Sequence, residues 1–75
     1  MYAMRPLSMV PPGTEVVIVE IRGGWRSAKR LQDMGLLPGV RLRVINNMGR
    51  APILIELNNS KLAIGRGLAQ KVIVR

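Results

Sequence analysis

The chain has 75 residues, which limits it to one domain near the lower size limit for independent folding, and no second domain fits. It contains no cysteine and no histidine, so neither a disulfide nor a Cys/His zinc cluster holds the fold together, and its 48% hydrophobic content must form the core. Twelve Lys and Arg against four Asp and Glu give a formal charge of +8, which points to a polyanionic partner: nucleic acid, an anionic membrane surface or an acidic protein surface.

Two features narrow these classes. One Trp, one Tyr and no Phe cannot build the aromatic platform on which single-strand binders stack bases, which argues against nucleic acid. No apolar run approaches the roughly 18 to 20 residues that span a bilayer, and the N-terminus lacks the apolar segment of a secretory signal. We therefore expect a soluble, cytoplasmic protein. Residues 1–7 carry no strong pattern and are expected to be flexible.

The first strand and the helix follow in chain order. Residues 14–21 are rich in Val and Ile and predict a strand whose two faces are both mostly apolar, so we expect cover on both sides for much of its length. After Gly23-Gly24, apolar residues recur at helical spacing and predict a short helix that docks its apolar stripe on the sheet. The stripe consists of Trp25, Ala28, Leu31 and Met34, and Trp25 fits either a core anchor or an exposed contact.

The helix is expected to end at a glycine. Gly35 can adopt a left-handed conformation after the last turn, Leu36 can fold back on that turn, and Pro38-Gly39 predicts a tight turn. Residues 40–45 then alternate apolar and charged with period two, as in a half-buried strand.

The remaining chain predicts a hairpin and a closing strand. Residues 53–57 and 61–64 are strands joined at Asn58-Asn59, residues 65–70 form a single helical turn, and residues 71–75 are the last strand. The fold class is therefore mainly β: a small SH3-like, partly open barrel of about five strands with one short helix and one helical turn, with the OB-fold as second choice.

Catalysis and metal binding find little support in these residue types. General acid–base chemistry normally uses His or a tuned carboxylate, and the four carboxylates are scattered without paired spacing. Without imidazole or thiolate, no strong transition-metal site can be assigned. We predict no enzyme, no catalytic residue, no cofactor and no metal ligand.

The order of several short blocks resembles the ferrous iron transport protein A (FeoA) family. These blocks are Pro12-Gly13, residues 30–39 with the sequence RLQDMGLLPG, residues 49–53 as a Gly-x-Pro-Ile loop with one extra residue, and residues 63–74. The resemblance implies an SH3-like domain and a role as a small cytosolic accessory protein that binds and modulates a FeoB-type membrane ferrous iron transporter. Alternatives are an RNA-binding SH3-like barrel and a metal-responsive regulatory module, since related domains occur in iron- and manganese-responsive repressors.

A partner-binding face is expected on the helix and the turn after it. Three basic side chains would steer the partner and three leucines would contact it, although each leucine also fits core packing. Arg41 and Arg43 would join this face if helix and strand docked side by side. An anionic membrane surface at the inner face of the membrane is a further candidate partner. The predicted partner-binding residues are Arg26, Lys29, Arg30, Leu31, Leu36 and Leu37.

Overall fold

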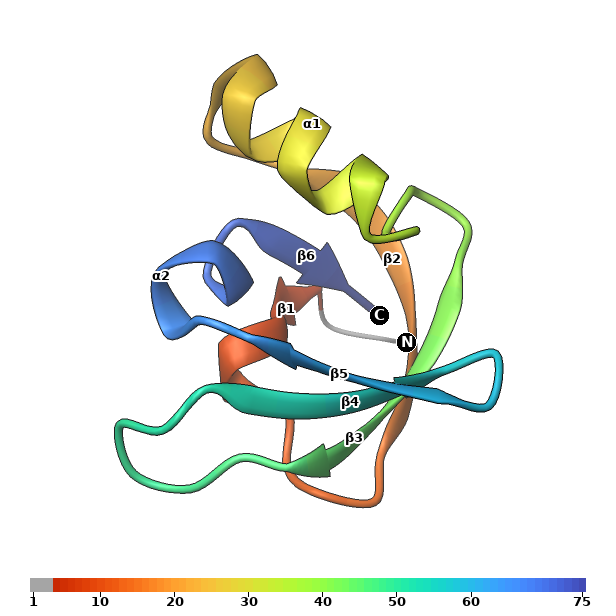
Figure 1. The fold of residues 1–75 in the computed structure, drawn as a ribbon, viewed down its shortest axis with the longest axis vertical. Coiled ribbons are helices and arrows are strands. Elements are labelled where there is room, and N and C mark those ends of the chain that lie inside the picture. The colour runs from red at the N-terminus through yellow and green to blue at the C-terminus, as the bar shows by residue number, and fades with distance from the viewer. Residues whose placement is uncertain (1–3) are drawn as a thin grey trace.

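Short strands and tight turns give the chain a curled antiparallel sheet with a helix at one end, as the computed structural model of residues 4–75 shows (Figure 1). The six strands are arranged in the order β1-β6-β2-β3-β4-β5. In chain order the elements are β1 (Arg5–Pro6), the 3-10 helix η1 (Leu7–Met9), β2 (Glu15–Ile21), α1 (Gly24–Asp33), β3 (Arg41–Asn46), β4 (Ile53–Leu57), β5 (Ser60–Ile64), α2 (Arg66–Ala69) and β6 (Val72–Val74).

Five of these strands, the helix and the helical turn agree with the prediction, and β1 is an additional strand. The stretch predicted to be flexible, residues 1–7, includes residues 1–3, which lie outside the described residues. The next residues are ordered into structure, because Arg5 pairs with Val74, Pro6 pairs with Ile73, and Leu7 is buried. Pro6 lacks a backbone donor, which suits it to a strand at the edge of a sheet.

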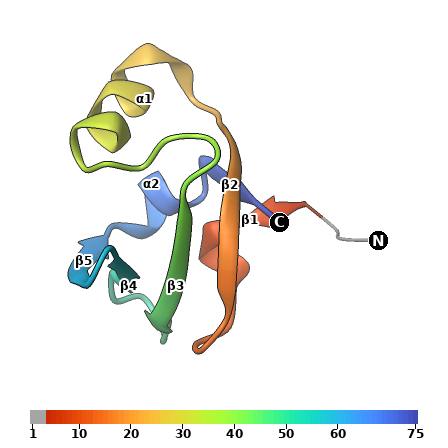
Figure 2. The same ribbon diagram turned by 90° about the vertical axis from the view of Figure 1, so that its right-hand side faces the viewer.

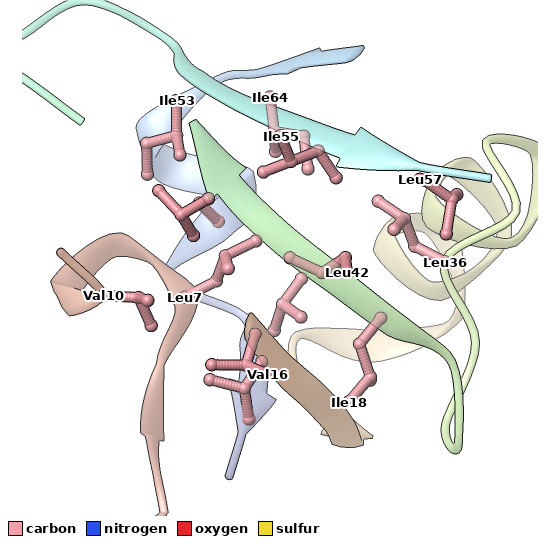
Figure 3. Packing of buried hydrophobic residues seen from close by; sticks show 14 of the residues in the cluster. Leu7, Val10, Val16, Ile18, Leu36, Leu42, Ile53, Ile55, Leu57 and Ile64 are labelled. Atoms are coloured by element: carbon pink, nitrogen blue, oxygen red, sulfur yellow. The ribbon is translucent and has the colours of Figure 1, made fainter. Parts of the chain in front are cut away.

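The sheet curls so that β4 and β5 face β2 and β6 across the core, with α2 between them (Figure 2). Register shifts in the β2–β6 ladder, between Ile18 and Glu20, and in the β3–β4 ladder, between Val44 and Asn46, accompany this curvature. Such irregularities bend a strand and increase its twist. Inward side chains from all layers meet in one cluster (Figure 3).

Buried and exposed side chains alternate along β3, as predicted for a strand that faces the core on one side only. In β3, Leu42 and Val44 are buried, whereas Arg41 and Arg43 point to solvent. In β2 the prediction of cover on both sides is met only in part, because the inner face is buried and the outer face, with Val17 and Val19, is half-buried. The predicted hairpin joins β4 to β5, and Asn58 and Asn59 both have positive φ, at 51° and 67°.

Candidate partner-binding site

The end of α1 is fixed by a pair of backbone hydrogen bonds. The Leu36 N–H donates to the Leu31 carbonyl at 2.8 Å, and the Gly35 N–H donates to the Gln32 carbonyl at 2.9 Å. Gly35 has a φ of 86°, in the left-handed region that favours glycine. This combination is a Schellman motif, in which an apolar residue after the glycine packs on the last turn of the helix. The predicted helix end is therefore confirmed, including the return of Leu36 toward that turn.

Two leucines of the predicted partner face are buried in the core by this motif. Leu31 and Leu36 are both 0% exposed and belong to the main hydrophobic cluster. Leu36 lies beside Leu57 in that cluster (Figure 3). A partner could contact either leucine only if the core opened, so direct contact by Leu31 and Leu36 was a wrong prediction. Their part in the site is to hold α1 and the following turn in place.

Leu37 lies on a rigid corner directly after these buried residues. The Val40 N–H donates to the Leu37 carbonyl at 3.0 Å, and Gly39 has a φ of 90°, as the third residue of a type II turn requires. Two further hydrogen bonds join the corner to β2: Gly39 N–H to Ile18 carbonyl at 2.7 Å, and Ile18 N–H to Val40 carbonyl at 2.9 Å. The Leu37 side chain is 42% exposed. An apolar side chain is thus presented to solvent on a backbone with little freedom.

The start of α1 differs from the prediction in which side faces the sheet. Ser27 is buried, and its hydroxyl oxygen accepts a hydrogen bond from Lys71 Nζ at 3.1 Å. The Lys71 stem also crosses Gly23, where an added Cβ would lie 2.5 Å from Lys71 Cδ. Trp25 precedes Ser27 by two residues, which is about 200° around a helix, so it points outward.

Trp25 is accordingly 72% exposed, so of the two interpretations left open for it the core anchor is excluded and the exposed position remains. The inward stripe is Ser27, Leu31 and Met34, at spacings of four and three residues. Sequence reasoning passed over it because serine is polar. The helical spacing could have identified this stripe. Ser27, Leu31 and Met34 share one side of a helix just as Trp25, Ala28, Leu31 and Met34 do, so spacing alone allowed both.

The three basic residues of the helix do lie together. Arg26, Lys29 and Arg30 are exposed and line one shallow, mainly apolar depression with Trp25 and Asp33. Lys29 Nζ lies 3.9 Å from a carboxylate oxygen of Asp33, and both side chains are mostly exposed. Solvent screens such a pair, so the basic character of this surface remains.

The basic residues of β3 lie elsewhere. Arg41 and Arg43 line a different depression, together with Glu15 and Glu56. Arg41 Nη1 lies 3.5 Å from a Glu15 carboxylate oxygen. The structure therefore does not bring the helix and strand cations onto one face, and the β3 pair sits among carboxylates.

Two further features bear on the kind of site. Within residues 4–75, no group of three or more carboxylate, His or Cys side chains is placed to hold a metal ion. Over the same residues, no helix combines the length and apolar character needed to cross a bilayer.

Fold and surface together define a small, mainly β module with one outlying basic helix and one exposed apolar corner. The chain belongs to the FeoA domain family, whose model matches residues 5–75. A protein of Methanocaldococcus jannaschii provisionally named Fe(2+) transport protein A is 41% identical over 71 residues, covering 95% of this chain and 85% of that protein.

Solved structures agree with this assignment. The crystal structure of an iron uptake regulatory protein (FeoA) superposes with a TM-score of 0.90 at 40% identity, covering 99% of this chain and 97% of that one. The manganese regulator SloR superposes with a TM-score of 0.84 over 95% of this chain and 34% of its own, at 15% identity. At that identity the likeness concerns the fold alone. The predicted family and the mainly β fold class are confirmed.

Proposed function

We propose that the protein is a non-enzymatic accessory protein of ferrous iron uptake, which binds the cytosolic region of a FeoB-type membrane iron transporter and modulates it. The observation that carries this proposal is the family match over residues 5–75, together with a relative of 41% identity that is named for Fe(2+) transport. The place of action would be the cytoplasm, at the inner face of the membrane.

The exposed corner after α1 supplies a suitable contact. Energetically important interface residues lose their water on binding and are surrounded by contacts that exclude solvent, and a residue held in place before binding loses less entropy. Leu37 meets this description, because the turn at residues 37–40 and its hydrogen bonds to β2 fix its position. Binding there would not require the core to rearrange. Leu37 is therefore the proposed apolar anchor.

The basic residues of α1 would act mainly on association. Arg26, Lys29 and Arg30 place three exposed positive charges along one helix. Charges of one sign on a surface raise the rate of encounter with an oppositely charged partner and make it sensitive to salt. We infer an acidic surface on the transporter's cytosolic region.

Capture of the protein by the immobilised cytosolic domain of the transporter tests this proposal. Leu37→Ala should weaken binding by roughly tenfold, the effect of about 1.4 kcal/mol at a contact residue. Arg30→Glu should lower the association rate, and the difference from the unaltered protein should shrink as salt is raised.

Two control substitutions match these in chemistry but lie outside the proposed face. Met48→Ala removes an exposed apolar side chain from the loop between β3 and β4, and Arg50→Glu reverses a charge in the same loop. This loop lies at the end of the molecule opposite α1 (Figure 1). Full binding by Leu37→Ala and Arg30→Glu, both shown to be folded, would contradict the proposed face. Loss of binding in Met48→Ala would move the contact to the opposite end.

A further inference from the structure

Most of the surface of α1 is uncovered, and its outer side carries the only tryptophan of the chain. Ser27 and Leu31 are the buried residues of this ten-residue helix. The helix lies at one end of the molecule, beyond the strands (Figures 1 and 2). Trp25, in its first turn, is 72% exposed. A large aromatic ring held out on a projecting helix contributes little to the core, so it is available for a contact outside the chain.

Three of the four charged residues that line the depression with Trp25 are cationic, and the fourth is Asp33, 3.9 Å from Lys29. Arg26 follows it directly, Lys29 lies one helical turn further on, and both line the same depression as the ring. No acidic residue is present in the first turn, and the N-cap residue Gly23 offers no side-chain cap. A positive charge in the first turn opposes the helix dipole, so Arg26 is not there to stabilise α1. Its charge is available to an external anion.

The shape of this surface suits a fluid partner rather than a single side chain. The depression is shallow and mainly apolar, and it is bordered by the long stems of Arg26 and Lys29. Trp favours the boundary between headgroups and acyl chains, while the stems of Arg and Lys pack on apolar groups and their charged ends reach lipid phosphates. We propose that the outer face of α1, defined by Trp25, Arg26 and Lys29, binds the anionic phospholipid surface of a bilayer.

This contact goes beyond the proposed transporter binding and does not depend on it. Trp25 lies in the first turn of α1 and Leu37 lies after its last turn, and ten residues of helix span about 15 Å. The lipid contact and the apolar anchor for the transporter are therefore at opposite ends of the helix. With Arg26 and Lys29 at the lipid surface, Arg30 would remain to steer the transporter, and the lipid contact would orient the module at the membrane.

The test is binding of the full chain to vesicles, read from the emission of Trp25. Because the chain has one Trp, its fluorescence reports on this surface alone. Vesicles of phosphatidylcholine with phosphatidylglycerol should shift the emission to shorter wavelength and sediment the protein, and pure phosphatidylcholine should do neither. Binding should weaken as salt is raised, because the cations provide much of the attraction.

Matched variants separate a local face from overall charge. Arg26→Gln with Lys29→Gln should reduce partitioning by roughly 25-fold, at about fivefold per cation near an anionic surface. Trp25→Ala, read by sedimentation, should reduce it by about tenfold, because a half-buried ring is lost. Arg43→Gln with Arg50→Gln removes the same charge from β3 and the loop after it, and should change partitioning by less than about threefold.

Three results would overturn the proposal. The first is an unchanged Trp25 emission with phosphatidylglycerol vesicles at low salt. The second is equal loss of binding in the two double variants, which would assign the effect to net charge. The third is a wavelength shift with poly-L-glutamate but none with vesicles, which would assign the face to an acidic protein. Capture by the transporter domain is measured separately, and Trp25→Ala should retain it, so failure of one contact is distinguishable from failure of the other.

Discussion

Leu36 and Leu37 follow one another in the chain but belong to two different parts of the molecule. Leu36 packs in the core against the end of α1, where the Gly35 turn directs it inward. Leu37 begins the next turn and is 42% exposed on the corner beside β2. The backbone of both residues is fixed by hydrogen bonds, so the difference between them lies in side-chain direction and not in order.

The comparison extends to the two sides of α1. One side, with Ser27 and Leu31, joins the helix to the sheet, and the other carries Trp25 and the cations. Residues of the first kind should govern folding and those of the second kind should govern binding. Substitutions at neighbouring positions can therefore be used to separate stability from recognition.

The largest expected effect is that of Leu36→Ala. Removing a fully buried leucine loses apolar burial and leaves a cavity, so the free energy of unfolding should fall by about 3 kcal/mol. That is a large part of the total for a domain whose stability is on the order of 4 to 11 kcal/mol. Leu37→Ala should change it by less than about 0.5 kcal/mol. Urea unfolding of the two variants measures both values, and equal losses would show that Leu37 also contributes to the core.

Gly35→Ala should have the next largest effect. Its φ of 86° is unfavourable for a residue with a Cβ, while the space is adequate, because the nearest atom to an added Cβ is Leu57 Cδ2 at 3.4 Å. The cost should be the backbone strain alone, about 1 to 2 kcal/mol. Gly67→Ala in α2 is the control, since its φ is not positive and nothing lies within 4 Å of an added Cβ. An unchanged midpoint for Gly35→Ala would mean that residue 35 does not hold the left-handed conformation on which the Schellman turn depends.

Local signals were sufficient to predict most of this architecture from the sequence. Glycine and proline at Gly35, Pro38 and Gly39 specify turns whose geometry depends on few neighbours, and those turns are present. Strand β1 could not be predicted in this way. It has only two residues, and it pairs with β6 at the other end of the chain. The sequence near Arg5 and Pro6 therefore contains no pattern that indicates a strand.

The orientation of α1 shows a second limit of sequence reasoning. Apolar spacing alone favoured Trp25 over Ser27 as the inward residue, because tryptophan has the larger apolar area. One contact that favours Ser27 on the inner side comes from Lys71, which reaches it from the turn before β6. That contact joins positions 44 residues apart and is invisible to local periodicity. The basic cluster on α1 was predictable, whereas which apolar side chain accompanies it was not.

Lys71→Met tests whether this distant contact holds the helix. Methionine keeps most of the apolar stem over Gly23 but cannot donate to the Ser27 hydroxyl, so stability should fall by about 1 kcal/mol, the value of one partly exposed hydrogen bond. Amide exchange in α1 should accelerate more than exchange in β3 and β4. Lys61→Met on β5 is the control, because that side chain is exposed at the sheet edge. Uniform acceleration across the chain would indicate a global effect in place of a specific one on α1.

The smallest expected effect on stability is that of Trp25→Ala. A tryptophan packed in a core costs about 3 to 5 kcal/mol when truncated to alanine, whereas at 72% exposure the change should be below about 0.5 kcal/mol. Thermal unfolding of the variant measures it. A loss near the larger values would mean that the ring packs on the sheet in solution, and both the outward face of α1 and its proposed lipid contact would fail together. Unchanged stability combined with weaker vesicle binding would show that the outer side of α1 serves binding and not folding. Leu36 and Leu37 divide the same two roles at the C-terminal end of the helix.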